Sequence, residues 1–460
     1  MSRLSGRGER FWHGETMKKT AADLRGFVRL LGKNKMLRAV QGPIDPQNIP
    51  HMLLENEKRK KAVLIRKVKG HQGSLISNIL GGDEFLSLAF GCSPKDILRE
   101  YVRRVKQPKK PNLLSSGPCQ EVVHTGEKMD VRLLPALIHH EKDAGSYITA
   151  GLAIARDPET GIRNVSFNRI QIVGSQELLI NIPQQLGLIQ KKAEAMGKPL
   201  EEAVSVGNHP FEMMAASSKP PFGTDEFDLA GALRQTALDL VPCKTISLEV
   251  PARAEVILEG EIPLNAKREE GPFGDFMGYY APMTMSHLFR LKAITHRRNF
   301  IFQAIRASSI EDVHLLSLPR EADIYSSLIE KGTQVESVSL RTMLFNCFIS
   351  IRKRFEDEAK GVIATAFAVY PWLKYCVVVD HDVDIFDARD VWWAIATRGC
   401  PERGTVLIPD SAGFYRDPFR IHQSKLGIDA LFPWANGTSL RGQESLRGGH
   451  PDWDKRFNSC

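Results

Sequence analysis

The pattern of hydrophobic and polar positions changes along the chain, and the changes mark three regions. The first combines helical segments with one apolar strand, and the second is dominated by long strand-like runs. The third alternates short strands with helices, the rhythm of an α/β layer. The predicted helices span 23–31, 93–105, 184–196, 225–240, 320–331, 356–368 and 387–397, and the predicted strands span 61–68, 147–155, 164–173, 246–258, 288–307, 335–340, 347–352 and 375–380.

Length and local composition place the boundaries between these regions. A chain of 460 residues is long enough for two or three domains with a large core. Residues 106–117 are rich in Pro, Lys and Ser and are typical of a linker. A charged helical segment at 320–331 separates the second region from the third.

Charge and cysteine content narrow the class of protein. The chain has 62 Lys and Arg against 54 Asp and Glu, and residues 1–110 alone carry 24 basic and 10 acidic residues. Such an excess is typical of a surface that meets a polyanion. The seven cysteines are scattered without a Cys-x-x-Cys pair, which argues against a disulfide framework and favours a reducing cytoplasm.

Several classes of protein have no support in the sequence. No apolar run approaches the ~20 residues of a membrane span, and the first twenty residues lack the apolar core of a secretory signal. Met17 is an equally good start, which would make residues 1–16 an extension. Because neither a Walker-type nor a strand-linked dinucleotide loop occurs, nothing favours the use of ATP or a dinucleotide.

The sequence Glu-Gly-Pro-Phe-Gly-Asp at 270–275 carries the most informative chemical signal. Its carboxylates, Glu270 and Asp275, bracket a loop in which glycines permit tight turns and proline restricts freedom. Such a loop can hold two acids near one point in different environments, as proton transfer requires. Taken alone, the residues fit a surface turn with two solvated acids as well.

A second cluster lies on the predicted strand 164–173. Alternation places Asn164, Ser166 and Asn168 on one face and Arg169 on the other, unless the strand ends or bulges there. A lined binding site and an edge strand with a wet face both explain the pattern.

A third cluster is the run Ala-Ala-Ser-Ser at 215–218, followed by Asp225 and Glu226. Small hydroxyl residues admit a flat ligand close to the backbone. The two acids are equally explained by helix capping and the helix dipole.

Three further patterns are attributed to ordinary structure. The run Asp-His-Asp-Val-Asp at 380–384 alternates metal-ligand types, but its place between a strand and a helix favours a solvated turn. The pair His139-His140 lacks a His-x-x-x-His partner. The basic run at 58–61 lacks interleaved aromatics. For this run and for the basic helix with Arg99, Arg103 and Arg104, a solvated face or a subunit contact is favoured over a nucleic-acid site.

Five motifs in this order resemble the UbiD family of reversible decarboxylases, which use prenylated flavin mononucleotide (prFMN). The resemblance covers residues 130–445 approximately. The motifs are Asn-x-Ser-x-x-Arg at 164–169, Ala-Ala-Ser at 215–217 leading to Glu226, Val-Pro-Ala-x-Ala-Glu-x-x-x-Glu-Gly at 250–260, Glu-Gly-Pro-Phe-Gly-Asp at 270–275 and Asp-Val-Trp-Trp-Ala-Ile-Ala at 390–396.

The resemblance implies a catalytic network of Arg169, Glu270 and Asp275. Asp275 would protonate the substrate carbon after carbon dioxide leaves, and Arg169 would orient the substrate carboxylate and couple to Glu270. Loss of a carboxylate from an sp² carbon leaves a poor carbanion, so an electron sink such as the modified flavin is required.

The resemblance also implies a metal and cofactor site. Asn164, Gln185 and Glu226 would hold a Mn²⁺ or Mg²⁺ ion that links the protein to the cofactor phosphate, with K⁺ nearby. The family commonly has a His where this chain has Gln185, a change that bears on metal identity and affinity. The residues expected to contact prFMN are Thr149, Asn164, Ser166, Phe167, Asn168, Arg169, Gln184, Gln185, Ser217, Ser218, Glu226 and Lys425, the last at its phosphate.

The implied fold is of the α+β and α/β classes. An N-terminal α/β subdomain (1–118) would pack on a cofactor domain with a split β-barrel core (119–308). A connecting helix (309–333) would lead to a C-terminal α/β oligomerisation domain (334–460), with the active site between the two domains. The chain would form a homodimer or homohexamer.

The implied function is reversible, non-oxidative decarboxylation of an aromatic, heteroaromatic or α,β-unsaturated carboxylic acid in the cytoplasm. A flavin prenyltransferase would supply the cofactor, and neither nucleic acid nor membrane would be a partner. Three alternatives stay open. They are a carboxylase subunit of a larger complex, a basic polyanion-binding protein without catalysis, and a family member that binds flavin but has lost catalysis.

Overall fold

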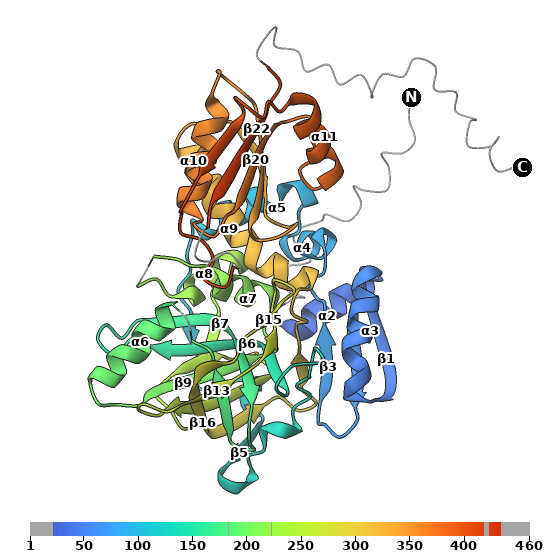
Figure 1. Ribbon diagram of the computed structural model, residues 1–460. Coiled ribbons are helices and arrows are strands. Elements are labelled where there is room, and N and C mark those ends of the chain that lie inside the picture. The colour runs from blue at the N-terminus through green and yellow to red at the C-terminus, as the bar shows by residue number, and fades with distance from the viewer. Residues whose placement is uncertain (1–21, 183, 222, 418–422, 434–460) are drawn as a thin grey trace, which may run out of the picture. The chain divides into compact units, whose positions relative to one another are not determined.

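The computed structural model describes residues 22–182, 184–221, 223–417 and 423–433 (Figure 1). Residues 1–16, where an alternative start is expected, lie outside them. The chain divides into two compact units, Met1–Asp323 and Ile324–Cys460, and the boundary falls inside α9 (Ile310–Glu330). No helix in the described segments is long and apolar enough to cross a membrane.

The first unit is built on a closed barrel of antiparallel strands, of which β6, β7, β9 and β16 are labelled in Figure 1. The strands pair in the order β12-β9-β6-β7-β8-β16, and β16 pairs again with β12. Closure leaves no unpaired edge in this ring. The strands are β6 (Tyr147–Arg156), β7 (Arg163–Ile172), β8 (Glu177–Ile180), β9 (Leu200–Val206), β12 (Val256–Ile262) and β16 (Thr284–His296), while β5 (Val122–Thr125) and β13 (Lys267–Glu270) add to β16.

Apolar side chains from these strands form one buried cluster with helix α6 (Gln184–Ala195). Ile148, Val204, Leu258 and Phe289 come from four different strands, and Leu186 comes from the helix. Burying each such side chain stabilises the fold by about 1.5–3 kcal/mol. The barrel is therefore a rigid base for the polar groups on β6 and β7.

A second sheet joins the N-terminal region to the end of the barrel segment. Its order is β1-β2-β3-β17, so a strand that follows the barrel in sequence pairs with β3. The elements of this region are α2 (Leu24–Lys33), β1 (Leu37–Ile44), η2 (Pro46–Asn48), α3 (Ile49–Lys58), β2 (Ala62–Val68), β3 (Ser74–Ser77), α4 (Asp83–Phe90), η3 (Pro94–Asp96), α5 (Ile97–Val105) and β17 (Ile301–Gln303). The remaining elements of the unit are β4 (Asn112–Leu113), η4 (Pro118–Gln120), η5 (Gly126–Lys128), η6 (Val131–Leu133), α7 (Pro210–Ser217), α8 (Glu226–Arg234), β10 (Asp239–Pro242), β11 (Glu249–Pro251), β14 (Phe273–Gly274) and β15 (Tyr280–Ala281).

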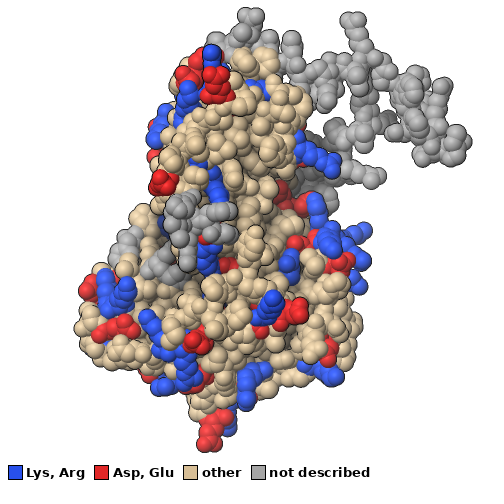
Figure 2. Space-filling view, in the orientation of Figure 1, with Lys and Arg blue, Asp and Glu red and all other residues tan. Residues whose placement is uncertain are grey.

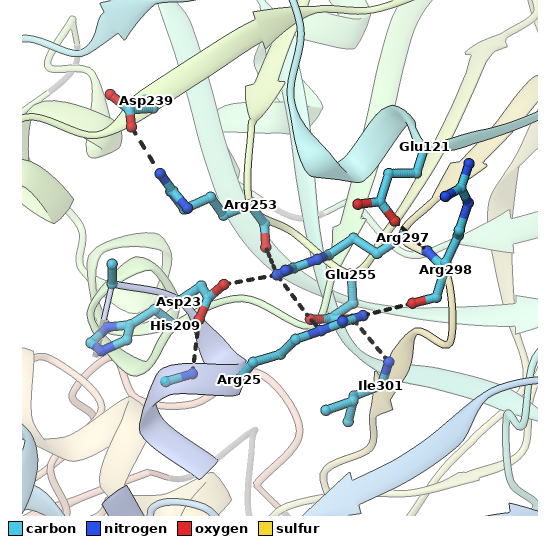
Figure 3. Close-up of polar contacts among 12 residues, drawn as sticks. Asp23, Arg25, Glu121, His209, Asp239, Arg253, Glu255, Arg297, Arg298 and Ile301 are labelled. Carbon is cyan, nitrogen blue, oxygen red and sulfur yellow. Dashed lines mark hydrogen bonds and ion pairs between the residues drawn. The ribbon is translucent and has the colours of Figure 1, made fainter. Parts of the chain in front are cut away.

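A buried cluster of charges fastens α2 to the barrel (Figure 3). Nε and Nη2 of Arg25 lie 2.8 Å from the two carboxylate oxygens of Glu255. Nη1 of Arg297 lies 2.8 Å from Oδ2 of Asp23 and 3.3 Å from Oε1 of Glu255. The amide of Ile301 donates to Glu255 as well (3.0 Å). Because Glu255 is fully buried, this network compensates a charge that would otherwise destabilise the fold.

The second unit holds a five-stranded mixed sheet in the order β18-β19-β20-β22-β21. Figure 1 shows α10 and α11 on opposite faces of this sheet. The elements are β18 (Val335–Ser339), β19 (Asn346–Ile351), α10 (Glu358–Val369), β20 (Tyr375–Asp380), α11 (Ala388–Arg398), β21 (Thr405–Ile408) and β22 (Lys425–Ala430). The predicted fold class, with a split-barrel unit, a connecting helix and a C-terminal α/β unit, is confirmed.

Four element predictions were wrong in extent. The helix predicted over 225–240 ends at Arg234, because Gln235 takes a left-handed conformation (φ +59°) and the chain continues as β10. The strand predicted over 246–258 is two strands, β11 and β12, and the strand predicted over 288–307 is β16 and β17. The helix predicted to begin at 320 begins at Ile310.

Candidate active site

A bulge between β6 and β7 sets the position of Arg169. Ile148 pairs with Ile170 and Gly151 with Asn168, so the two residues Thr149 and Ala150 face the single residue between those partners, Arg169. Such a bulge interrupts regular alternation and redirects a side chain. The sequence pattern allowed for a bulge as an exception to strict alternation. That bulge is present, with its extra residue on the neighbouring strand β6. On the same strand the predicted neighbours Ser166 and Asn168 do meet, since Nδ2 of Asn168 donates to Oγ of Ser166 (2.8 Å).

Arg169 and Glu270 form a buried bidentate pair. Nε of Arg169 lies 3.1 Å from Oε1 of Glu270, and Nη2 lies 2.8 Å from Oε2. The hydroxyls of Tyr147 (2.9 Å) and Ser286 (3.2 Å) donate to the same carboxylate, which is 1% exposed. The structure thus brings together two of the three predicted catalytic residues.

The electrostatics of this pair favour the charged arginine. Burial opposes the positive charge, yet the hydrogen bonds and charge of Glu270 raise the pKa of Arg169 above its ordinary value. The guanidinium also lies over the ring of Phe273, 5.3 Å from its centroid. Burial and the neighbouring Glu270 raise the pKa of Tyr147 well above its usual range, so its phenol stays protonated and keeps donating.

Asp143 holds the loop that follows Glu270. Its Oδ1 accepts from the amide of Gly274 (2.8 Å), and its Oδ2 accepts from the amides of His139 (3.0 Å) and His140 (2.9 Å). Burial favours the neutral acid, but these hydrogen bonds hold the pKa of Asp143 below its ordinary value. A Cβ at Gly274 would lie 2.3 Å from Nδ1 of His140, so only glycine allows the loop to approach this closely.

Asp275 follows directly and is 9% exposed. Its amide donates to the carbonyl of Tyr279 (2.9 Å), and its Oδ1 accepts from the amide of Phe276 (2.7 Å). Its carbonyl accepts from the amide of Gly278 (3.0 Å). The negative charge of Asp275 acts on Arg169, and both acids of the loop therefore act on one guanidinium. The loop is a buried feature of the unit and not the solvated turn that residue types alone permitted.

The three predicted metal ligands come together from β7, α6 and α8. Nδ2 of Asn164 lies 3.3 Å from Oε1 of Gln185 and 3.2 Å from Oε1 of Glu226. Oε2 of Glu226 accepts from the amide of Val165 (2.7 Å). A cavity of about 20 Å³ lies beside Asn164 and Gln185, enough for a water or an ion.

Two observations show that this set fits a cation. Oδ1 of Asn164 is buried and has no hydrogen-bond partner within the described residues, and a half-turn of its amide directs it toward the same two oxygens. Burial raises the pKa of Glu226 to about 8, and the amide of Val165 only partly offsets this. A hard cation with oxygen ligands would satisfy both groups.

The other predicted cofactor residues have the following positions. Oγ1 of Thr149 accepts from the amide of Ile305 (2.9 Å). The hydroxyls of Ser217 and Ser218 donate to carbonyls of their own helix, those of Met213 (2.9 Å) and Ala215 (2.5 Å). Phe167 is half-buried on β7, and Gln184 begins α6 with a side chain outside the described part.

Lys425 lies in the second unit, where it begins β22. Its Nζ donates to the carbonyls of Pro371 (2.5 Å) and Leu373 (2.8 Å). Burial lowers the pKa of this ammonium group.

Sequence reasoning missed Tyr147, Ser286 and Asp143. Tyr147 begins an apolar strand and looks like an ordinary core aromatic, while Ser286 is one polar residue on a mixed strand. Asp143 lies in a segment of turn residues. A phenol at the head of an otherwise aliphatic strand was the one available signal.

Two patterns attributed to solvated structure need correction. Asp380 is buried, and Arg398 bonds to both Asp380 (2.8 Å) and Asp382 (2.7 Å). These two acids of the 380–384 run form an ion-pair cluster, while His381 and Asp384 are exposed. Arg104 in the basic helix is also buried, and its guanidinium donates to the carbonyls of Leu233 (2.7 Å) and Phe90 (2.6 Å). On the face seen in Figure 2, basic side chains are interspersed with acidic ones.

His314 in α9 is buried against the N-terminal region. Its Nδ1 lies 3.0 Å from the carbonyl of Leu80. This contact gives it a structural partner.

Three family models match consecutive segments of the chain. Profiles of the 3-octaprenyl-4-hydroxybenzoate carboxy-lyase N-terminal domain, Rift-related domain and C-terminal domain match residues 28–105, 112–309 and 313–430. An anhydromevalonate phosphate decarboxylase of Methanothermobacter thermautotrophicus is 32% identical over 425 residues, which are 91% of this chain and 99% of that protein.

Two solved structures are similar over nearly the whole chain. The UbiD-class enzyme HmfF from Pelotomaculum thermopropionicum, in complex with FMN, matches with a TM-score of 0.86 and 33% identity over 95% of this chain and 100% of that one. An evolved dimeric form of that enzyme, in complex with prFMN, matches with a TM-score of 0.84 and 32% identity over 95% and 98%.

These matches over almost the whole chain define a carboxy-lyase. The chain belongs to the UbiD family, and it is a decarboxylase of that family.

Proposed function

We propose that this protein catalyses reversible, non-oxidative decarboxylation of an aromatic, heteroaromatic or α,β-unsaturated carboxylic acid with prFMN. The observation that carries the proposal is the buried bidentate pair of Arg169 and Glu270, with Asp275 on the loop that continues from Glu270. The similar proteins support it, since one decarboxylates anhydromevalonate phosphate and others hold FMN and prFMN.

Arg169 orients the substrate carboxylate. Within the described residues its hydrogen bonds go to Glu270 through Nε and Nη2, which leaves the Nη1 edge for a ligand. Glu270 is itself held by Tyr147 and Ser286, so the guanidinium is fixed before substrate arrives. A preorganised cation of this kind needs little rearrangement during reaction.

Asp275 is the proton donor. When the bond to the carboxylate breaks, carbon dioxide leaves and the bonding electron pair stays on the substrate side. Asp275 then gives its proton to the substrate carbon and becomes a carboxylate, which solvent reprotonates. In the reverse direction the same carboxylate removes that proton.

The cofactor is held by the groups already described. When bound, prFMN supplies the electron sink that a protein side chain cannot provide. Asn164, Gln185 and Glu226 would hold a Mn²⁺ or Mg²⁺ ion at its phosphate, with K⁺ nearby, and Lys425 would meet the same phosphate. Thr149, Ser166, Phe167, Asn168, Arg169, Gln184, Ser217 and Ser218 would line the flavin.

We also assign roles to the parts of the chain. Residues 119–308 would bind prFMN, with residues 1–118 packed on them, 309–333 would connect, and 334–460 would assemble a homodimer or homohexamer. The dimeric form of the similar enzyme supports an assembled state. The enzyme would work in the cytoplasm, where a flavin prenyltransferase supplies its cofactor.

Co-expression with a flavin prenyltransferase tests the proposal. The purified protein should show the absorption of prFMN and, with Mn²⁺ present, release carbon dioxide from at least one acid of a panel. The panel should include anhydromevalonate phosphate, a heteroaromatic acid and 3,4-dihydroxybenzoic acid, with hydrogen/deuterium exchange as a second readout. Protein that takes up neither flavin nor deuterium, and releases no carbon dioxide, would contradict the proposal.

A further inference from the structure

Two histidines face each other across the paired strands β5 and β16. His124 lies opposite Ile294 in the ladder, so its side chain is on the same face of the sheet as that of His296, two residues further along. Their Nε2 atoms are 3.2 Å apart, and the rings are stacked with an interplanar angle of 25°. His296 ends β16, whereas Ser286, which holds Glu270, lies near its beginning. The pair is therefore separate from the site described above.

A backbone contact fixes the tautomer of His296. Its Nδ1 lies 2.9 Å from the carbonyl oxygen of Arg297, and a carbonyl can only accept, so Nδ1 carries the proton. In the neutral ring Nε2 is then unprotonated and faces His124. Metal-binding histidines are usually oriented in this way, by donation from their other nitrogen to a carbonyl or a carboxylate. Phe300 packs against the ring, with 5.0 Å between the centroids, and helps to hold it in place.

The separation of the two nitrogens suits a single metal ion. Zn²⁺ binds imidazole nitrogen at about 2.0–2.1 Å, so two such ligands at a tetrahedral angle are about 3.3–3.4 Å apart. The observed 3.2 Å needs little adjustment. In the metal-free pair Nε2–H of His124 donates to Nε2 of His296. When the ion binds, that proton passes through solvent to Nδ1 of His124, and both Nε2 lone pairs bind the metal.

The surroundings favour a cation that enters from solvent. The carboxylate of Glu121 accepts from the amide of Arg298 (2.7 Å; Figure 3), and its negative charge also acts on His296. His124 is half-buried and His296 is 9% exposed, so the open side of the pair is that of His124. Within the described segments no group of three or more His, Cys, Asp and Glu side chains surrounds one point. Water would therefore complete the coordination shell.

We propose that His124 and His296 form a binding site for a divalent transition-metal ion of the group Zn²⁺, Ni²⁺ and Cu²⁺, for which imidazole is a suitable ligand. The ion would join β5 to β16 through side chains, in addition to their backbone pairing. The inference does not rest on the proposed function, because it uses none of the residues assigned to prFMN or substrate.

Calorimetry with Zn²⁺ tests this site on the full-length, flavin-free chain without a polyhistidine tag. A Glu226→Gln background removes the other proposed metal site from the measurement. One equivalent of Zn²⁺ should bind at neutral pH, and His124→Gln should weaken that binding by about tenfold or more. The glutamine amide can still donate to His296, so this variant keeps the hydrogen bond and loses the ligand. His287→Ala, on the same strand, is the matched control and should leave Zn²⁺ affinity unchanged.

Electron paramagnetic resonance of the Cu²⁺-loaded chain identifies the ligands. The spectrum should show coupling to two imidazole nitrogens, and one of these should be lost in His124→Gln. Binding of less than one equivalent of Zn²⁺, equal affinity in His124→Gln and its parent, or a Cu²⁺ spectrum without nitrogen coupling would overturn the inference. Absence of decarboxylation would contradict the proposed function alone, because both measurements are made without substrate.

Discussion

Two buried glutamates of the first unit, Glu255 and Glu270, are each held by Nε and Nη2 of an arginine. Arg25 holds Glu255 with 26% of its side chain exposed, and Arg169 holds Glu270 with 14% exposed. Nη2 of Arg25 also donates to the backbone carbonyls of Arg298 (3.0 Å) and Asn299 (3.2 Å). Arg169 lies instead over an aromatic ring and beside Asp275.

The difference lies in the further partners of each Arg–Glu pair. Around Glu255 every partner belongs to the fold, and the cluster holds a helix against the barrel (Figure 3). Around Glu270, two hydroxyl groups donate hydrogen bonds to the carboxylate. We therefore expect the arginine to bind a ligand. A buried Arg–Glu pair is therefore not a mark of function in itself.

The largest effect should follow from removing the transferable proton of Asp275 while keeping the shape of its side chain. Asp275→Asn preserves shape but holds no transferable proton, so we expect turnover and deuterium exchange to fall by about 10³-fold or more. Flavin content and thermal midpoint should stay close to those of the parent. Carbon dioxide release at near-parental rates would show that another group donates the proton.

Matched lysine substitutions test the comparison itself. Arg169→Lys should lower kcat/KM by about 10²–10³-fold, because an ammonium cannot hold Glu270 bidentately and orient a substrate carboxylate together. Arg25→Lys should lower stability and leave kcat/KM within a factor of about two. Equal kinetic losses in both variants would remove the distinction between the two pairs.

The Glu255 cluster should dominate stability. Glu255→Gln leaves Arg25 and Arg297 facing a neutral group, and breaking a buried pair costs about 3–5 kcal/mol of unfolding free energy. Denaturant unfolding measures this loss. Residual folded protein should keep normal turnover, and a parental unfolding midpoint would contradict the assigned role.

A third buried glutamate, Glu202, shows the consequence of lacking an arginine. Both of its carboxylate oxygens are without a hydrogen-bond partner in the described part of the chain, and burial raises its pKa to about 8. The folded state therefore binds a proton that the unfolded state releases near pH 4.5. The contribution of Glu202 to the free energy of unfolding should be complete below pH 4.5. It should be lost, by on the order of a few kcal/mol, as the pH rises to about 8. Glu202→Gln should flatten this decline, measured as thermal midpoints between pH 5 and pH 9, and an equal decline in both proteins would argue against it.

The smallest expected effect concerns Gln185, a neutral residue among the three proposed metal ligands. Gln185→His restores the residue typical of the family and should tighten Mn²⁺ binding by on the order of tenfold, measured by calorimetry on flavin-free protein. Glu226→Gln is the matched loss and should abolish that binding. Metal affinity that does not respond to either change would place the ion elsewhere.

Local sequence patterns predicted the individual helices and strands better than the pairing of the strands with one another. The strands at 147 and 164 and the helix at 184 were found because their patterns are local. Closure of the barrel depends on the pairing of β12 with β16, whose paired residues are 29 to 40 positions apart, and no local pattern reports it. The break after Arg234 was missed because a single left-handed residue ends the helix.

The candidate site was predictable where its residues lie in short motifs. Arg169, Glu270 and Asp275 were named from the motifs, and the structure joins the first two directly. Tyr147 and Asp143 were missed, because each acts on a residue more than a hundred positions away and looks ordinary in its own segment.

The bulge in β6 makes the site sensitive to chain length in a way that substitutions do not reveal. Side chains alternate along a strand, so deletion of Ala150 would move each preceding side chain of β6 to the opposite face. Tyr147 would then exchange places with Ile148. The phenol would then leave Glu270 and enter the apolar cluster. Insertions and deletions at 149–150 should therefore abolish activity. In the turn at 157–162, which joins β6 to β7, they should be tolerated.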